Sequence, residues 1–173
     1  MNNTETLAIS REKITVLIQF ITLVGVATIV PLFHQQTITG PVINATLFVS
    51  TMLLGFQAGI IVGLVPSIIA LSAGLLPPVL TPMIPFIMVG NAILVVTFNV
   101  LKDRNYWLGV ILASILKFAF LSGTSLTVVN LLLKKEIARQ AAIMMSWPQL
   151  LTAIAGGVLA YLFVKFYKRS FCC

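Results

Sequence analysis

A single lysine, Lys117, lies inside the apolar segment that runs from Trp107 to Leu133. An unpaired charge in hydrocarbon is costly, so a lysine there is a candidate functional residue. Lys117 follows Trp107 by ten residues, or about 15 Å along a helix, which places it near the bilayer centre. No acidic residue lies inside any apolar segment. The Lys117 ammonium must therefore bond to carbonyls, asparagines, water or an anionic ligand, unless the side chain extends to the cytoplasmic interface.

Polar residues on neighbouring segments could share this chemistry. Asn91 and Asn99 lie eight residues apart in the fourth segment and so fall roughly on one helix face. Asn91 is near mid-membrane and needs a hydrogen-bond partner, which is either another helix or a ligand. On the helix of Lys117, Ser114, Leu121 and Thr124 share the face of the lysine, whereas Asn130 lies on the opposite face.

A second set of polar and aromatic residues is expected near the outer ends of the spans: Asn44, Ser146, Trp147 and Gln149. With His34 and the proline segment Leu75–Pro85, they could enclose an outward-facing pocket. Two simpler interpretations stay open: Trp147 as an interface anchor and His34 as an ordinary loop residue. The candidate ligand-binding residues are Asn91, Lys117, Trp147, Gln149, His34 and Asn44.

Composition defines the environment. The 173-residue chain is 59% hydrophobic and 9% charged, and its mean hydropathy is +1.08. A soluble domain averages about a quarter charged residues, so we expect an integral membrane protein in contact with the lipid bilayer. The net charge of +7 does not indicate nucleic-acid binding, because the basic residues sit at the ends of the apolar segments.

The sequence lacks the residue sets that catalysis requires. It has no Gly-rich phosphate loop, no HExxH, no acid pair and no Ser/His/Asp set, and it contains one histidine. Its two cysteines, Cys172 and Cys173, are adjacent and form no metal-binding pattern. We therefore predict a protein that is not an enzyme, with no metal and no cofactor.

The apolar segments predict an all-α integral membrane protein, a compact bundle of six transmembrane helices in one domain over residues 1–173. Gly and Pro at Thr39–Pro41 predict a turn, Gly55–Gly59 divides the next apolar stretch, and the prolines of Leu75–Pro85 predict irregular backbone. The predicted parts are a cytoplasmic tail at 1–13 and spans at about 14–33, 42–55, 58–74, 84–101, 107–133 and 148–164.

Basic residues predict the orientation of the chain. Six spans place seven basic residues inside (Arg11, Lys13, Lys102, Arg104, Lys165, Lys168, Arg169) and three outside (Lys134, Lys135, Arg139). Because cytoplasmic loops are enriched in Lys and Arg, we expect both termini in the cytoplasm of a cell (plasma) membrane protein. Four spans, also an even number, are the alternative.

Three sequence strings carry a family resemblance: TGPVINATLFVSTMLLGFQAG, GLLPPVLTPMIPFIMVGN and MMSWPQLLTAIAGG. With the size, the six spans and the basic ends, they make nearly the whole chain resemble the substrate-binding (S) components of energy-coupling factor transporters. The resemblance implies an S-component-like bundle that captures a vitamin, vitamin precursor or similar micronutrient from outside. It also implies a coupling transmembrane subunit and two ATPases as partners.

The resemblance further implies which parts form the pocket. The segments His34–Gly40 and Leu75–Pro85 would cover it, and Asn91, Trp147 and Gln149 would face it. One feature departs from the family: the first span, QFITLVGVATIV, lacks the Ala-xxx-Ala pair that commonly docks the coupling subunit. Gly59 and Gly63 could offer a substitute. The alternative function is a structural or assembly membrane protein whose polar residues only bond helices together.

Overall fold

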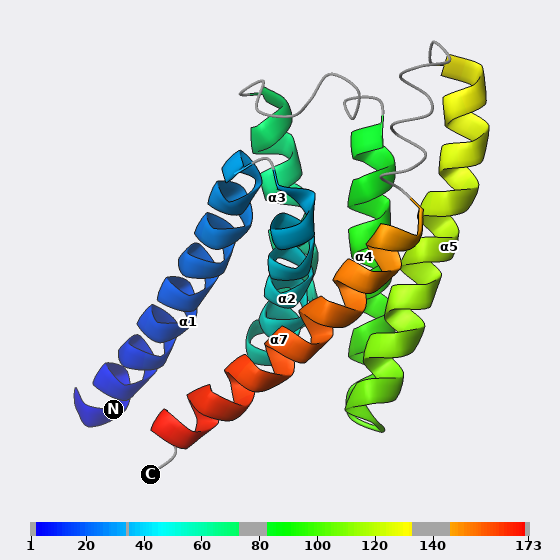
Figure 1. Cartoon of the computed structure of the whole chain (residues 1–173). Coiled ribbons are helices and arrows are strands. Elements are labelled where there is room, and N and C mark those ends of the chain that lie inside the picture. The colour runs from blue at the N-terminus through cyan, green and yellow to red at the C-terminus, as the bar shows by residue number, and fades with distance from the viewer. Residues whose placement is uncertain (1–2, 34, 73–82, 133–145, 172–173) are drawn as a thin grey trace.

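The computed structural model describes residues 3–33, 35–72, 83–132 and 146–171, and all regular secondary structure in these ranges is helical (Figure 1). The first helix, α1, is followed directly by a short 3-10 helix, η1, before the chain turns back. The elements are α1 (Asn3–Ile29), η1 (Val30–Phe33), α2 (Gln36–Leu54), α3 (Phe56–Ser72), α4 (Ile84–Leu101), α5 (Tyr106–Leu132) and α7 (Trp147–Phe171).

Within the described residues there are six α-helices, and five of them are long and apolar enough to cross a membrane. Their candidate spans are Arg11–Phe33, Thr37–Leu54, Ile84–Leu101, Tyr106–Ser125 and Trp147–Arg169, and α3 contributes the shorter apolar helix Phe56–Ile69. The described residues therefore confirm an all-helical protein and indicate that it passes the membrane several times.

The helices run alternately up and down, so both chain termini lie at one end of the bundle, here named the terminal end (Figure 1). The connection between α4 and α5, at Lys102–Asn105, lies at the same end. Helix α2 is central and packs against α1, α3, α4 and α7, while α5 packs against α4 and α7.

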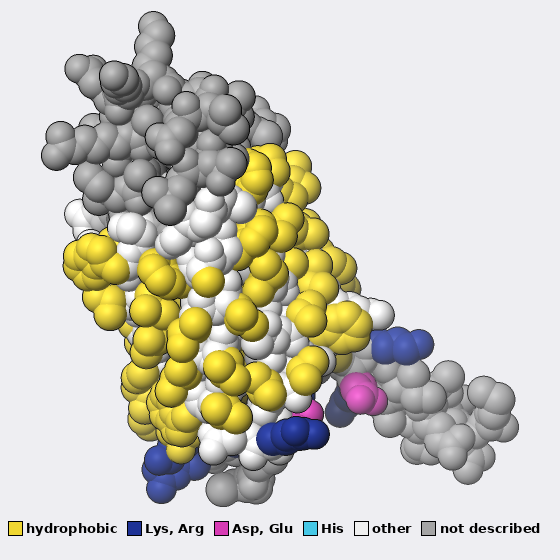
Figure 2. Space-filling model, turned by 90° about the vertical axis from the view of Figure 1, so that its right-hand side faces the viewer, with side chains coloured by type: hydrophobic (Ala, Val, Ile, Leu, Met, Phe, Trp, Pro, Cys, Tyr) yellow, Lys and Arg dark blue, Asp and Glu magenta, His cyan; other side chains and the backbone are white. Residues whose placement is uncertain are grey.

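The core receives buried apolar side chains from every described α-helix, with the largest shares from α2 and α4. Phe48 of α2 and Phe98 of α4 are fully buried and meet edge to face at 4.7 Å. Outside the core, large apolar side chains are exposed on the helices, including Ile21 and Val100. Figure 2 shows hydrophobic side chains over the middle of one face and Lys and Arg side chains at its lower end. A hydrophobic exterior of this extent suits contact with lipid.

The predicted turn at Thr39–Pro41 is wrong, because these residues lie inside α2. Pro41, the sixth residue of the helix, lacks an N–H and so removes one intrahelical hydrogen bond in the second turn, which the helix tolerates. Gly40 fits this position because α7 is so close: a Cβ there would lie 2.7 Å from Cγ2 of Thr152. The helix therefore begins at Gln36, six residues before the predicted start of the second span.

The division at Gly55 is confirmed. Gly55 separates α2 from α3 with φ of +89°, a left-handed conformation that favours glycine. The outer helices are longer than predicted: α1 extends into the expected tail from Asn3, and α7 continues to Phe171. Residues 73–82, most of the predicted proline segment, lie outside the described residues, as does His34.

Candidate functional site

Lys117 is bonded to two asparagines from two other helices. Its Nζ donates hydrogen bonds to Oδ1 of Asn44 on α2, at 2.7 Å, and to Oδ1 of Asn91 on α4, at 2.8 Å. All three side chains are buried, with exposed fractions of 4% for Lys117, 2% for Asn44 and 4% for Asn91. These three residues are the lysine–asparagine cluster, and its ammonium stays inside the bundle instead of extending to the interface.

The cluster lies at mid-span on every helix that contributes to it. Lys117 is near the middle of the candidate span Tyr106–Ser125, and Asn91 is near the middle of Ile84–Leu101. Asn44 is likewise near the middle of Thr37–Leu54. The three helices therefore contribute these residues at one level of the bundle, near the middle of their candidate spans.

Backbone carbonyls hold the two asparagines in place. Nδ2 of Asn44 donates to the carbonyl oxygen of Gly40 one turn earlier, at 2.9 Å. Nδ2 of Asn91 donates to the carbonyl oxygen of Gly63 on α3, at 3.2 Å. With one N–H of each amide bonded to a carbonyl oxygen, both carboxamide oxygens accept from Lys117. The cation thus has a fixed, preorganised pair of acceptors.

Glycines let the helices approach closely enough to form the cluster. A Cβ added at Gly63 would lie 3.2 Å from Cβ of Asn91. One added at Gly156 of α7 would lie 2.6 Å from Cβ of Asn44 and 2.8 Å from the backbone nitrogen of Ala45. Both asparagines are therefore backed by a glycine on a neighbouring helix, as is typical of close packing in membranes.

The charge of the cluster is not balanced within the described residues. The described carboxylates are Glu12 and Asp103, both exposed, and Asp103 pairs with Lys102 at 3.0 Å in the α4–α5 connection. The two asparagines are neutral. A protonated Lys117 therefore leaves one positive charge in the bundle, and only two of its three N–H groups have partners among the described residues.

The helix face of Lys117 continues toward the other end of the bundle as a buried stripe. Ser114 and Leu121 are fully buried, and Ser114 donates to the carbonyl oxygen of Val110 at 2.7 Å. Ser125, two turns beyond Lys117, is 2% exposed, and its hydroxyl has no partner among the described residues. Of the predicted stripe, Ser114, Lys117 and Leu121 are buried, and Thr124 is partly buried and donates to the carbonyl oxygen of Phe120 at 2.8 Å; Ser125 was not part of the prediction.

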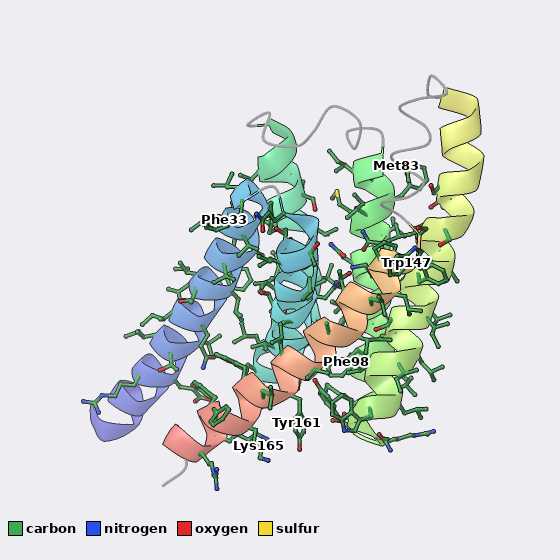
Figure 3. All side chains as sticks on the ribbon, viewed as in Figure 1. Phe33, Met83, Phe98, Trp147, Tyr161 and Lys165 are labelled. Atoms are coloured by element: carbon green, nitrogen blue, oxygen red, sulfur yellow. The ribbon has the colours of Figure 1, made fainter. Side chains whose placement is uncertain are left out.

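The remaining predicted site residues lie apart from the cluster. Trp147 is 63% exposed at the start of α7 (Figure 3), nine residues or about 13 Å along that helix from Gly156. Gln149 is partly buried in the same first turn, and its carbonyl oxygen accepts from Thr152 at 3.1 Å. His34 is outside the described residues. Asn99 is partly buried and lies eight residues, or about 12 Å along α4, from Asn91.

Sequence reasoning named all three members of the cluster but did not join them. The predicted second span begins at residue 42, which places Asn44 near the outer end of that span. With the helix beginning at Gln36, Asn44 lies about 12 Å inside it. The local residues give no signal of this start, because Gly40 and Pro41 are typical of a turn.

Three glycines, on α3 and α7, serve packing between helices of this chain. Gly59 and Gly63 are buried against Thr51, Val95, Leu47 and Asn91, so they cannot offer the substitute docking surface considered above. Gly157 packs on Val110, and its carbonyl oxygen accepts a 2.6 Å hydrogen bond from the Tyr106 hydroxyl. Gly59, Gly63 and Gly157 therefore bring helices of this chain together.

The described residues define an all-helical, multi-pass membrane protein with a lysine–asparagine cluster between its helices. Comparison with known proteins adds no family: no protein-family model matches the chain, and no curated protein or solved structure matches it.

Proposed function

We propose that this protein is the membrane-embedded substrate-binding subunit of an uptake system for a small molecule, of the energy-coupling factor type. The observation that supports it best is the lysine–asparagine cluster, which holds a cation at mid-span among four helices. An intramembrane ionisable residue that faces the bundle interior typically marks a substrate or ion pathway.

The cluster is better suited to binding than to holding helices together. A neutral side chain with an N–H or O–H donor at residue 117 could bond to a neighbouring helix without placing a charge in the membrane. Lysine instead adds a charge that the described residues leave unbalanced, and a spare N–H group. The Ser125 hydroxyl supplies a second buried donor on the same face of α5. Both favour a solute that enters from between the helices.

The ends of the bundle support the proposed topology. The basic residues Arg11, Lys13, Lys102, Arg104, Lys165, Lys168 and Arg169 lie at or near the terminal end. Since basic residues favour the cytoplasmic side, we place both termini in the cytoplasm of the plasma membrane. In this orientation the solute, a vitamin or similar micronutrient, enters from the end opposite the termini.

Partners complete the proposed system. The sequence has no phosphate-binding loop, so ATP hydrolysis would come from separate ATPase subunits through a coupling transmembrane subunit. Helix α1 offers an exterior apolar surface for such a subunit, with Leu17 and Ile21 more than half exposed. The glycines of α3 are excluded from this role by their burial.

Analysis of co-purified small molecules tests the proposal. The purified wild-type protein is denatured, and the released compounds are identified by mass spectrometry against the Lys117→Met variant and the control Lys168→Met, whose lysine is exposed at the terminal end. We expect one compound, at up to one equivalent, in the wild type and the control but not in Lys117→Met. No specific compound in any sample would support the alternative, a structural or assembly protein.

A further inference from the structure

The charge and the geometry of the lysine–asparagine cluster point to a chemical class of ligand. We infer that the cluster binds a solute carrying one carboxylate and no other charge, through the spare N–H group of Lys117. This inference rests on the proposed function, which states only that a small molecule is bound.

The first reason is charge balance. Lys117 is the one described cation at mid-span, because the other described Lys and Arg residues belong to the two terminal segments and the α4–α5 connection. One carboxylate neutralises one ammonium. A dianion such as a phosphate monoester would leave a net negative charge in the bundle, and a neutral solute would leave the positive charge in place. Both alternatives keep an unpaired charge out of water, which is unfavourable.

The second reason is the direction of the available bond. Asn44 and Asn91 occupy two positions on Nζ from α2 and α4, and both asparagines are fixed by the carbonyl oxygens of Gly40 and Gly63. Each amide nitrogen keeps a second N–H group, but the Lys117 ammonium is the one charged donor of the cluster. A carboxylate oxygen is a strong acceptor for a charged donor. The cluster therefore favours an acidic group, and its positive charge disfavours a cationic one.

Replacing one asparagine by aspartate tests the charge requirement with little change of shape. In Asn91→Asp, a carboxylate oxygen takes the place of the oxygen that Lys117 already contacts, so the protein supplies its own counter-ion. The same reasoning applies to Asn44→Asp on α2, which serves as the second variant if one of the two does not fold. Asn99→Asp is the control, because it makes the same change on α4 eight residues from Asn91.

The measurement has two parts. Compounds retained by each purified variant are identified by mass spectrometry. The melting temperature in detergent is then followed with increasing benzoate, hexanoate, their neutral amides benzamide and hexanamide, and phenyl phosphate. Variants are compared only if they elute as a single species in size-exclusion chromatography.

We expect wild type and Asn99→Asp to retain a monocarboxylate, and its affinity for Asn91→Asp or Asn44→Asp to fall by about 100-fold or more. Among the probes, the acids should raise the melting temperature more than their amides and phenyl phosphate. A retained neutral, cationic or doubly charged compound, or one held equally by the aspartate variants, would overturn the carboxylate inference but leave the proposed function standing. No retained compound and no response to any probe would overturn both.

Discussion

The coupling between Lys117 and Asn91 can be measured as a free energy. In Asn91→Ala, the ammonium loses one of its two acceptors and the carbonyl oxygen of Gly63 loses its interhelical donor. A hydrogen bond to a charged group contributes about 1.5–3 kcal/mol, and a neutral interhelical bond in a membrane contributes about 0.6 kcal/mol. We therefore expect the free energy of unfolding to fall by roughly 2–4 kcal/mol.

A double-mutant cycle separates the charged bond from the rest. The Lys117→Met background has no ammonium, so Asn91→Ala there removes only the hydrogen bond to Gly63 and the side-chain volume. The same substitution in the wild-type background removes both of these and also the bond to the ammonium. The expected cost is then about 1 kcal/mol, and the difference between backgrounds, about 1.5–3 kcal/mol, is the coupling energy.

The assay is reversible unfolding in mixed micelles with increasing denaturing detergent, followed by the fluorescence of the two tryptophans. Lys117→Met removes a buried charge, which is favourable, but leaves Oδ1 of Asn44 and of Asn91 without this donor, which is unfavourable, so the cycle is evaluated from the difference between backgrounds and not from this variant alone. Equal costs of Asn91→Ala in the two backgrounds, within about 0.5 kcal/mol, would refute the reasoning, since independent sites add to that precision.

Three further outcomes are expected. Gly156→Ala should lower the free energy of unfolding by about 2 kcal/mol in the same assay, because the added Cβ would meet Asn44 and nearby α2 backbone. The control Gly25→Ala has nothing within 4 Å of the added Cβ and should be neutral or stabilising. Similar losses in both variants would contradict the packing at Gly156. Tyr106→Phe removes the 2.6 Å bond to the Gly157 carbonyl and should lower the unfolding free energy by about 1 kcal/mol; an unchanged value would show that this bond contributes nothing. A fluorescent protein fused to the C-terminus should fold and fluoresce, whereas periplasmic alkaline phosphatase fused there should be inactive, and the reverse pattern would contradict the proposed orientation.

The helical architecture was predictable because long apolar segments have one stable form in a membrane, the helix. Gly55 was correctly identified as a division, since its left-handed conformation reflects a local preference of glycine. The boundary at Thr39–Pro41 was not predictable from the same local rules. There, tertiary packing decides: the close approach of Thr152 accommodates Gly40, and the helix tolerates Pro41 near its start.

The candidate site was predictable in part for a related reason. Lys117 and Asn91 stood out because polar side chains are rare at mid-span, and their burial follows from the same cost. Their contact with Asn44 depends on how far α2 extends toward its N-terminus, which a sequence pattern sets only to within a few residues. The acceptor role of Gly63 depends on the α3–α4 packing, and no residue type signals it.

An experimental structure of the protein with its retained solute tests the central claim most directly, through the distance from Nζ of Lys117 to the nearest solute oxygen. We predict a solute oxygen about 2.8 Å from Nζ, as in other charge-assisted hydrogen bonds, within the cluster formed with Asn44 and Asn91. A solute bound elsewhere, with Nζ still bonded only to the two asparagines, would contradict the claim.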